Sequence, residues 1–352
     1  MKRGIILWLL VLVVVVLLFA LPIAIGDAAI TSIGVYVLLF TGAAVAWNMF
    51  SGYTGYISLG QATYYGVGAY ALALLCRSFN VPGGVGPFLL LPLCGLIAAL
   101  FAVPLGWIAL RTKRYAFVVM TIAIFFIMQL LAFNLPGLTS GPRGVLLPTP
   151  DWGPDVFDLP FYYVALAIFL LAAIVSWRVR RSKFGLDLLA IRDDEKRARS
   201  LGVPVGRYKL LAYILSAFFI GMVGAVVVYY AGLTTPEFAF NPSFDVSMAV
   251  IAFVGGIGTV LGPIVGGLLL GPIQQYLNLQ FSSIAAGFEL VLLGGLLLLI
   301  ILLLPEGIVP SLQRLWLRWM VIRRQRSSAK LAAGKQHPDD TLLAESSRGR
   351  KG

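Results

Sequence analysis

The polar side chains best placed to do chemistry lie in a glycine-rich, otherwise apolar segment at residues 52–70. It reads GYTGYISLGQATYYGVGAY, and Asn48 lies just before it. Hydroxyl and amide groups at membrane depth are costly unless they face protein or water. Small residues that pack helices together are the alternative interpretation for any single position. The cluster as a whole favours a pathway for a hydrogen-bonding solute, lined by Asn48, Gly55, Ser58, Gly60, Gln61 and Thr63.

A second glycine-rich segment, VGGIGTVLGPIVGG at residues 254–267, interrupts an apolar stretch and contains Pro263. Paired Gly/Pro interruptions in two halves of a chain are typical of transporters built from structural repeats. We therefore expect two short, broken spans over 244–279 and a 5+5 inverted repeat. The residues that we add to the predicted pathway are Gly255, Gly256 and Gly258.

The third informative segment is the basic loop at residues 178–209, which holds ten Lys and Arg residues. Its central part, 183–204, predicts one short helix with an apolar face, because its apolar residues recur at helical spacing. That face carries Leu188, Ile191, Ala198 and Leu201, and the opposite one carries Arg192, Asp194, Lys196, Arg197 and Arg199. Plain helix connections are about two to eight residues long. An interfacial helix on anionic lipid is one interpretation, but the acidic run at 193–195 favours docking to a protein.

Catalytic and metal-binding patterns are missing from the sequence. His337 is the only histidine, and Cys76 and Cys94 have neither metal-ligand spacing nor a disulfide framework. The sequence has no Gly-x-x-x-x-Gly-Lys-Ser/Thr loop to bind ATP phosphates. We therefore expect no enzyme activity, no metal and no cofactor bound by this chain.

The composition predicts the elements that position these residues. The 352-residue chain is 59% hydrophobic and 12% charged, whereas about 25% of residues are charged in a soluble domain. A soluble enzyme and a disordered scaffold are thereby excluded. About 20 apolar residues in a helix cross a bilayer, so the fold class is an all-α polytopic membrane protein with about ten transmembrane or partly broken helices. The predicted spans outside 244–279 are 5–25, 30–50, 56–76, 87–110, 115–135, 161–177, 210–231 and 288–304.

The net charge of +12 belongs mainly to one face of the membrane. Of the 27 basic residues, 25 lie at the N-terminus, after the fourth span, in the 178–209 loop and in the tail. Because basic residues concentrate in cytoplasmic loops, both termini are predicted in the cytoplasm, and ten spans satisfy that parity. The basic patches lack a nucleic-acid-binding fold. We expect contacts with membrane lipid and none with nucleic acid.

The C-terminal part divides into two further segments. Residues 311–326 predict an interfacial amphipathic helix, since Leu312, Leu315, Trp316 and Trp319 share a helical face. Residues 327–352 have the composition of a disordered basic tail. The transmembrane domain is then predicted over residues 1–310.

Taken in order, the motifs resemble the permease subunits of bacterial branched-chain amino acid ABC importers, especially the longer M-type member. The resemblance is carried by 52–70, by TSGPRGV at 139–145, by residues 183–225, by GGIGTVLGP at 255–263 and by PEGIV at 305–309. It implies that EKRARSLG at 195–202 takes the place of the EAA coupling loop, although the usual Glu-Ala-Ala start is replaced here. Gln61 stands where many relatives have His. The residues implied in coupling are Gly185, Arg192, Asp193, Asp194, Glu195, Ala198, Leu201 and Gly202.

The resemblance also implies the partners and the location. Such permeases work as a pair of homologous membrane subunits, with two cytosolic ATP-binding subunits that use ATP and Mg and a periplasmic or lipid-anchored solute-binding protein. The location implied is the bacterial cytoplasmic (inner) membrane.

The sequence indicates little about the substrate. Apart from Asp245 and Glu289, expected near the outer ends of spans, no ionisable side chain is clearly embedded. A neutral pathway fits inward transport of branched-chain or related amino acids, and it fits urea or short-chain amides equally. From another class, an ion-coupled secondary transporter would need an embedded acidic pair or histidine relay, and an intramembrane enzyme would need a metal or nucleophile at membrane depth.

Overall fold

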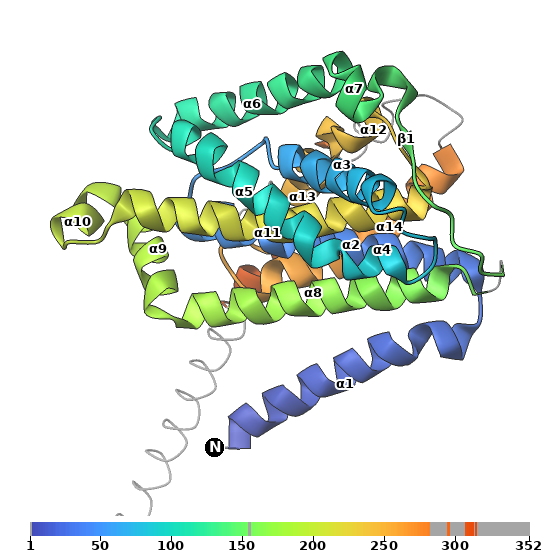
Figure 1. The fold of residues 1–352 in the computed structure, drawn as a ribbon. Helices are drawn as coiled ribbons and strands as arrows, with labels where there is room; N and C mark the ends of the chain where they lie inside the picture. Colours follow the sequence, from blue (N-terminus) through green and yellow to red (C-terminus); the bar gives the residue numbers. More distant parts are fainter. Residues whose placement is uncertain (1, 154–155, 282–293, 296–306, 313, 315–352) are drawn as a thin grey trace, which may run out of the picture.

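The computed structural model describes residues 2–153, 156–281, 294–295, 307–312 and 314, and nearly all the regular structure in them is helical. The elements, in chain order, are α1 (Lys2–Ile25), α2 (Ala28–Trp47), the π-turn η1 (Asn48–Gly52), α3 (Ala62–Ser78), α4 (Gly86–Leu89), α5 (Leu91–Ala109), α6 (Arg114–Asn134), α7 (Pro136–Thr139), the 3₁₀ turn η2 (Gly141–Arg143), β1 (Val145–Leu146), α8 (Asp158–Arg181), α9 (Lys183–Asp193), α10 (Glu195–Ser200), α11 (Val205–Ala231), β2 (Leu233–Thr234), α12 (Pro236–Ala239), α13 (Pro242–Gly255) and α14 (Leu261–Phe281). Figure 1 shows the long helices laid side by side.

Six helical segments in the described ranges are long and apolar enough to cross a membrane. They confirm the prediction of an all-α polytopic membrane protein. These segments are Ala28–Gly52, Leu91–Ala109, Arg114–Asn134, Asp158–Arg181, Val205–Ala231 and Pro236–Gly255. The tail at 327–352 and most of the predicted span at 288–304 and of the interfacial helix at 311–326 lie outside the described residues.

Helix α11 lies at the centre of the bundle, packed against α3, α5 and α2. Its central turns are buried on all sides, as expected of a uniformly apolar helix inside a bundle. Glycines bring its backbone onto α3: a Cβ added at Gly68 would overlap the carbonyl of Gly221, and one added at Gly224 would overlap the carbonyl of Tyr65. Small residues at such crossings are the usual means of close helix packing in membranes, so these glycines are structural.

Two connections differ from the sequence prediction. The single helix predicted over 183–204 is two helices, α9 and α10, because Asp194 is extended and caps the second one. Its side chain accepts hydrogen bonds from the amides of Lys196 and Arg197 at 2.9 and 3.1 Å. Leu201, predicted on the apolar face, is 83% exposed, whereas Leu188, Ile191 and Ala198 are buried.

The third predicted span also begins later than expected. Residues 55–60 are unwound and α3 starts only at Ala62, whereas the prediction began the span at residue 56. In contrast, the stretch 244–279 is broken as predicted, with α13 ending at Gly255 and α14 beginning at Leu261. The 5+5 inverted repeat stays a prediction.

Candidate coupling and translocation site

The first helix break is held against the end of α2. The π-turn η1 leads into the unwound residues 55–60, where Gly55 has a φ of +71°, a conformation that favours glycine. The indole of Trp47 donates to the carbonyl of Ser58 at 2.8 Å, and the Ser58 amide donates to Ser51 Oγ at 3.2 Å. These bonds satisfy backbone groups that the helix no longer pairs.

The second break, residues 256–260, is built in a similar way. Gly256 and Gly258 have φ values of +121° and +79°. The Thr259 hydroxyl donates to the carbonyl of Gly256 at 2.8 Å and accepts from the amide of Gly262 at 2.9 Å. A Cβ at Gly255 would overlap the carbonyl of Gly262, so α13 and α14 touch backbone to backbone where they diverge.

Asn48 joins the two breaks. Its Oδ1 accepts from the amide of Gly258 at 2.7 Å, and its Nδ2 donates to the carbonyl of Thr259 at 2.8 Å. The side chain is fully buried, and it pairs both backbone groups of a turn about 210 residues away in sequence. The two glycine-rich segments picked out in the sequence therefore form one connected structure.

The 178–209 loop reaches the same place through Arg192, at the C-terminal end of α9. Its Nη1 donates to the carbonyl of Gly52 at 2.9 Å, and its guanidinium fills the space that a Cβ at Gly258 would need. Arg114, at the start of α6, donates in turn to the carbonyl of Arg192 at 2.8 Å. The sequence analysis placed Arg192 on the face opposite the apolar residues of the loop helix. In the structure that face of α9 directs Arg192 toward both unwound segments.

Glu195, the first residue of α10, makes the second connection. Its Oε2 accepts from the Tyr56 hydroxyl at 2.6 Å, and its Oε1 accepts from Lys209 at 3.1 Å and from Arg199 at 3.2 Å. The Lys209 side chain is only 4% exposed and lies 4.1 Å from the centre of the Tyr56 ring. Partial burial raises the pKa of Glu195, but the hydrogen bonds and cations around it outweigh that effect and hold its pKa below the ordinary value. The carboxylate is thus charged at neutral pH.

The other predicted coupling residues lie in the same loop as Arg192 and Glu195. Gly185 is buried where α9 turns back on α8, and a Cβ there would overlap the carbonyl of Val179. Ala198 is buried beneath α10, and Gly202 ends that helix with a φ of +86°. Asp193 and Leu201 are exposed, and Asp194 is the cap described above. Coupling by these residues stays a prediction.

Three residues of the site were missed or misplaced by the sequence analysis: Tyr56, Lys209 and Asp245. Asp245 was expected near the outer end of a span, but its side chain is 3% exposed and its Oδ1 accepts from the amide of Ala62, at the start of α3, at 3.1 Å. The sequence analysis had named Asp245 as an exception at the end of a span; it lies in the first turn of α13, but it is buried there among protein groups. Nothing local to these residues predicts their partners, which come from segments far away in sequence.

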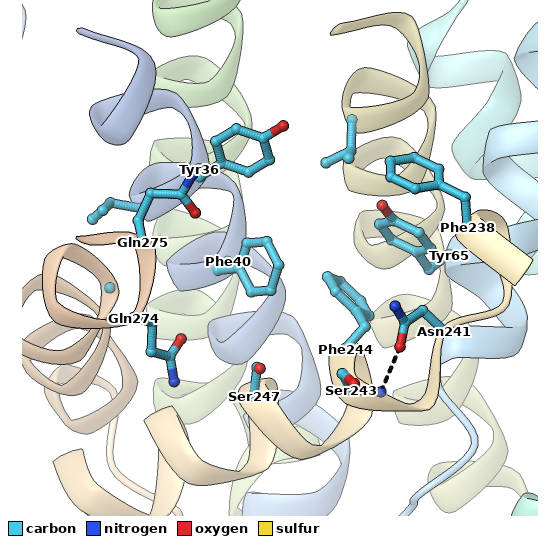
Figure 2. Close-up of a pocket in the computed structure, with 13 residues that line it drawn as sticks. Tyr36, Phe40, Tyr65, Phe238, Asn241, Ser243, Phe244, Ser247, Gln274 and Gln275 are labelled. Carbon is cyan, nitrogen blue, oxygen red and sulfur yellow. Dashed lines mark hydrogen bonds between the residues drawn. The ribbon is translucent and has the colours of Figure 1, made fainter. Parts of the chain in front are cut away.

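Two cavities flank the breaks. The larger, of about 1030 Å³, lies between α10 and the turn at 110–114, and Tyr56, Glu195 and Lys209 line it. The smaller, of about 240 Å³, lies among α2, α3, α13 and α14 (Figure 2). None of the predicted pathway residues lines the smaller cavity. Ser58, Gln61 and Thr63 are instead fully buried, and Gly60 packs on the carbonyl of Thr121.

The comparison with known protein families gives a single answer. Residues 28–301 match the family described as branched-chain amino acid transport system / permease component. The chain belongs to this family. The match covers both helix breaks and the 178–209 loop, so the fold and the site described above are those of a family member.

Individual proteins similar to this chain are members of the same family. The chain is 29% identical to the high-affinity branched-chain amino acid transport system permease protein LivM of Salmonella typhimurium (strain LT2), over 86% of this chain and 75% of the relative. It is 29% identical to LivM of Escherichia coli (strain K12), over 78% and 68% of the two chains. It is also 25% identical to LivH of Escherichia coli (strain K12), over 76% of this chain and 89% of the relative. No solved structure is significantly similar to the chain.

Proposed function

We propose that this chain is a membrane-spanning permease subunit of an ATP-driven importer that moves branched-chain or related amino acids into the cytoplasm. The observation that carries the proposal is the pair of contacts from the 178–209 loop to the helix breaks. Arg192 bonds the carbonyl of Gly52, and Glu195 bonds the hydroxyl of Tyr56. A loop that served only to connect α8 and α11 would have no need to bond the unwound backbone.

The partners follow from what the chain itself carries. It has no phosphate-binding loop, so ATP and Mg would be bound by two separate cytosolic subunits. Leu186 and Leu201 are 59% and 83% exposed on the charged loop, and apolar side chains ringed by charge are typical of protein interfaces. We assign these two leucines to the contact with an ATP-binding subunit. A second, homologous permease subunit and a solute-binding protein outside the membrane complete the assembly, with lipid around it.

The orientation of the chain rests on its basic residues. Arg111, Lys113 and Arg114 line the same cavity as the 178–209 loop, so these two basic connections lie at one end of the bundle. The strand pair β1–β2 lies at the other end in Figure 1. By the positive-inside rule the basic end faces the cytoplasm. We therefore propose a multi-pass protein of the inner membrane with both termini inside.

The mechanism follows from the same contacts. Closure of the ATP-binding subunits would shift α9 and α10, and the bonds from Arg192 and Glu195 would pull on residues 52–56. Because Asn48 ties that segment to residues 256–260, both breaks would move together. ATP then biases one of two arrangements of the bundle, as a ligand must do to drive a conformational change.

Uptake into proteoliposomes tests the proposal. The full complex should accumulate leucine only when ATP and the loaded binding protein are present. Glu195→Ala and Gly202→Val should hydrolyse ATP without uptake, while the exposed control Lys183→Ala should behave as wild type. Uptake driven by a pH jump without ATP would instead identify a secondary transporter. Accumulation of urea in place of leucine would favour the short-amide alternative.

A further inference from the structure

Asp245 is a buried carboxylate inside an apolar span. Its side chain is 3% exposed, and none of the ion pairs among the described residues involves it. A carboxylate at membrane depth is costly unless it is paired, and such residues usually mark a substrate or ion pathway. Its Oδ1 accepts from the amide of Ala62 at 3.1 Å, and the backbone of Gln61 also donates to the carboxylate, whereas Oδ2 has no hydrogen-bond partner in the described part of the chain.

The surroundings of Asp245 are also incompletely paired. Ala62 begins the 17-residue helix α3, whose first amides and dipole favour a negative group. Next to it, both polar atoms of the Gln61 side chain are buried and have no hydrogen-bond partner among the described residues. Unpaired buried polar groups are costly. Such a cluster therefore points to a polar ligand that completes it.

The smaller cavity adjoins this cluster on the same two helices. Tyr65 lies three residues after Ala62 on α3, and Phe244 precedes Asp245 on α13; their rings pack 4.2 Å apart. Figure 2 shows Tyr36 and Phe40 facing them across the cavity. No charged side chain lines this space, and amides such as Gln274 line its rim. Its chemistry suits an aliphatic group.

We propose that Asp245, Gln61 and the N-terminus of α3 bind the charged ends of a zwitterionic, aliphatic amino acid in transit. Asp245 takes the ammonium group. The Ala62 amide and Gln61 take the carboxylate, which replaces the Asp245 oxygen that caps α3 in this structure. The aromatic cavity receives the aliphatic chain once Tyr65 and Phe244 separate. This assignment rests on the proposed function and goes further by naming the groups recognised.

The first test is Asp245→Asn in the complete complex. Asparagine keeps the oxygen that caps α3 but loses the charge, so a purely structural role would leave uptake unchanged. We expect leucine uptake to fall about tenfold or more, as the loss of a charge-assisted bond implies, while the loaded binding protein still stimulates ATP hydrolysis. The matched control is Asp27→Asn, since Asp27 caps α2 through Ala29 at 2.8 Å but is exposed. Uptake by Asp245→Asn at the wild-type rate would overturn the proposal.

A second test measures occupancy directly. A cysteine at Gln61→Cys should react with a small thiol reagent during turnover, and leucine should slow that reaction while urea should not. The control Ser200→Cys, exposed on α10, should react equally with and without leucine. Failure of leucine to protect Gln61→Cys would refute the site. The proposed function is judged separately, by whether the wild-type complex takes up leucine with ATP at all.

Discussion

The hydroxyl of Tyr56 offers the sharpest perturbation of the link between the 178–209 loop and the first helix break. Tyr56→Phe removes only the 2.6 Å bond to Glu195 Oε2. The ring keeps its edge contact with Phe117, at 5.5 Å between centroids, and its place beneath Lys209. Lys209 continues to pair Glu195 Oε1. The substitution therefore cuts one connection without opening a cavity or leaving a buried charge alone.

The size of the effect can be worked from the geometry. A hydrogen bond to a charged group contributes about 1.5–3 kcal/mol, and the Glu195 side chain is 25% exposed, which favours the lower part of that range. A loss of about 1.5–2 kcal/mol changes an equilibrium by about 10- to 30-fold. If the bond biases the bundle toward one of its two arrangements, that bias falls by the same factor.

The assay is the number of leucine molecules imported for each ATP hydrolysed in proteoliposomes. We expect Tyr56→Phe to lower this ratio about tenfold while ATP hydrolysis continues. Tyr163→Phe is the matched control, since its hydroxyl makes only a long 3.4 Å bond to the carbonyl of Phe19 on α1. A ratio unchanged from wild type in Tyr56→Phe would refute the idea that this bond transmits the movement.

The remaining predictions concern the second break, the hydrogen bonds of Asn48 between the two breaks, and the charge of Glu195. Gly255→Ala should lower the thermal midpoint of the purified protein, because its Cβ overlaps the carbonyl of Gly262; Gly137→Ala, with open space around it, should not. Asn48→Ala should lower the free energy of unfolding by about 1–3 kcal/mol, because the buried amide of Gly258 loses its acceptor. A thermal midpoint equal to that of the wild type would contradict this. Because the pKa of Glu195 is lowered in the fold, its stabilising contribution should persist at and above the ordinary carboxyl range and disappear as the pH falls through the lowered value. Thermal midpoints measured against pH should therefore converge for wild type and Glu195→Gln only in acid.

The break at residues 256–260 was predictable from the sequence because its cause is local. Glycine lacks the side chain that stabilises a helix, and clusters such as GGIG at 255–258 and the glycines at 52–60 weaken the helix wherever they fall. Long apolar runs identify spans through the cost of leaving backbone unpaired in lipid. The unwinding at residues 55–60 was nevertheless missed within the predicted span 56–76, because its residues are as apolar as those of a helix.

The structure of the 178–209 loop was only partly predictable. The spacing of its apolar residues correctly predicted that Leu188, Ile191 and Ala198 are buried. The pattern is continuous across Asp194, however, and periodicity does not register a one-residue interruption. Asp194 followed by Glu195 is a common helix start, and that local pattern could have revealed the two helices.

The partners of the buried charges were not predictable from one sequence. Tyr56 meets Glu195 across 139 residues, and Asp245 meets Ala62 across 183. Composition and periodicity describe neighbours along the chain, whereas these contacts depend on how α3, α11 and α13 pack together. The sequence therefore identified most of the residues of the site but not the bonds among them.

The arrangement of the loop also explains why charge is so concentrated in a chain that has little of it. Arg192 and Glu195 face inward and bond the unwound segment, whereas Leu186 and Leu201 face outward. Charge-assisted bonds are the strong ones, and unwound backbone carbonyls and a tyrosine hydroxyl are suitable partners for them. An apolar outer contact, by comparison, can form and separate without leaving a buried charge unpaired. In the proposed mechanism, docking and transmission would then depend on different side chains of the same loop, so each could change strength without the other.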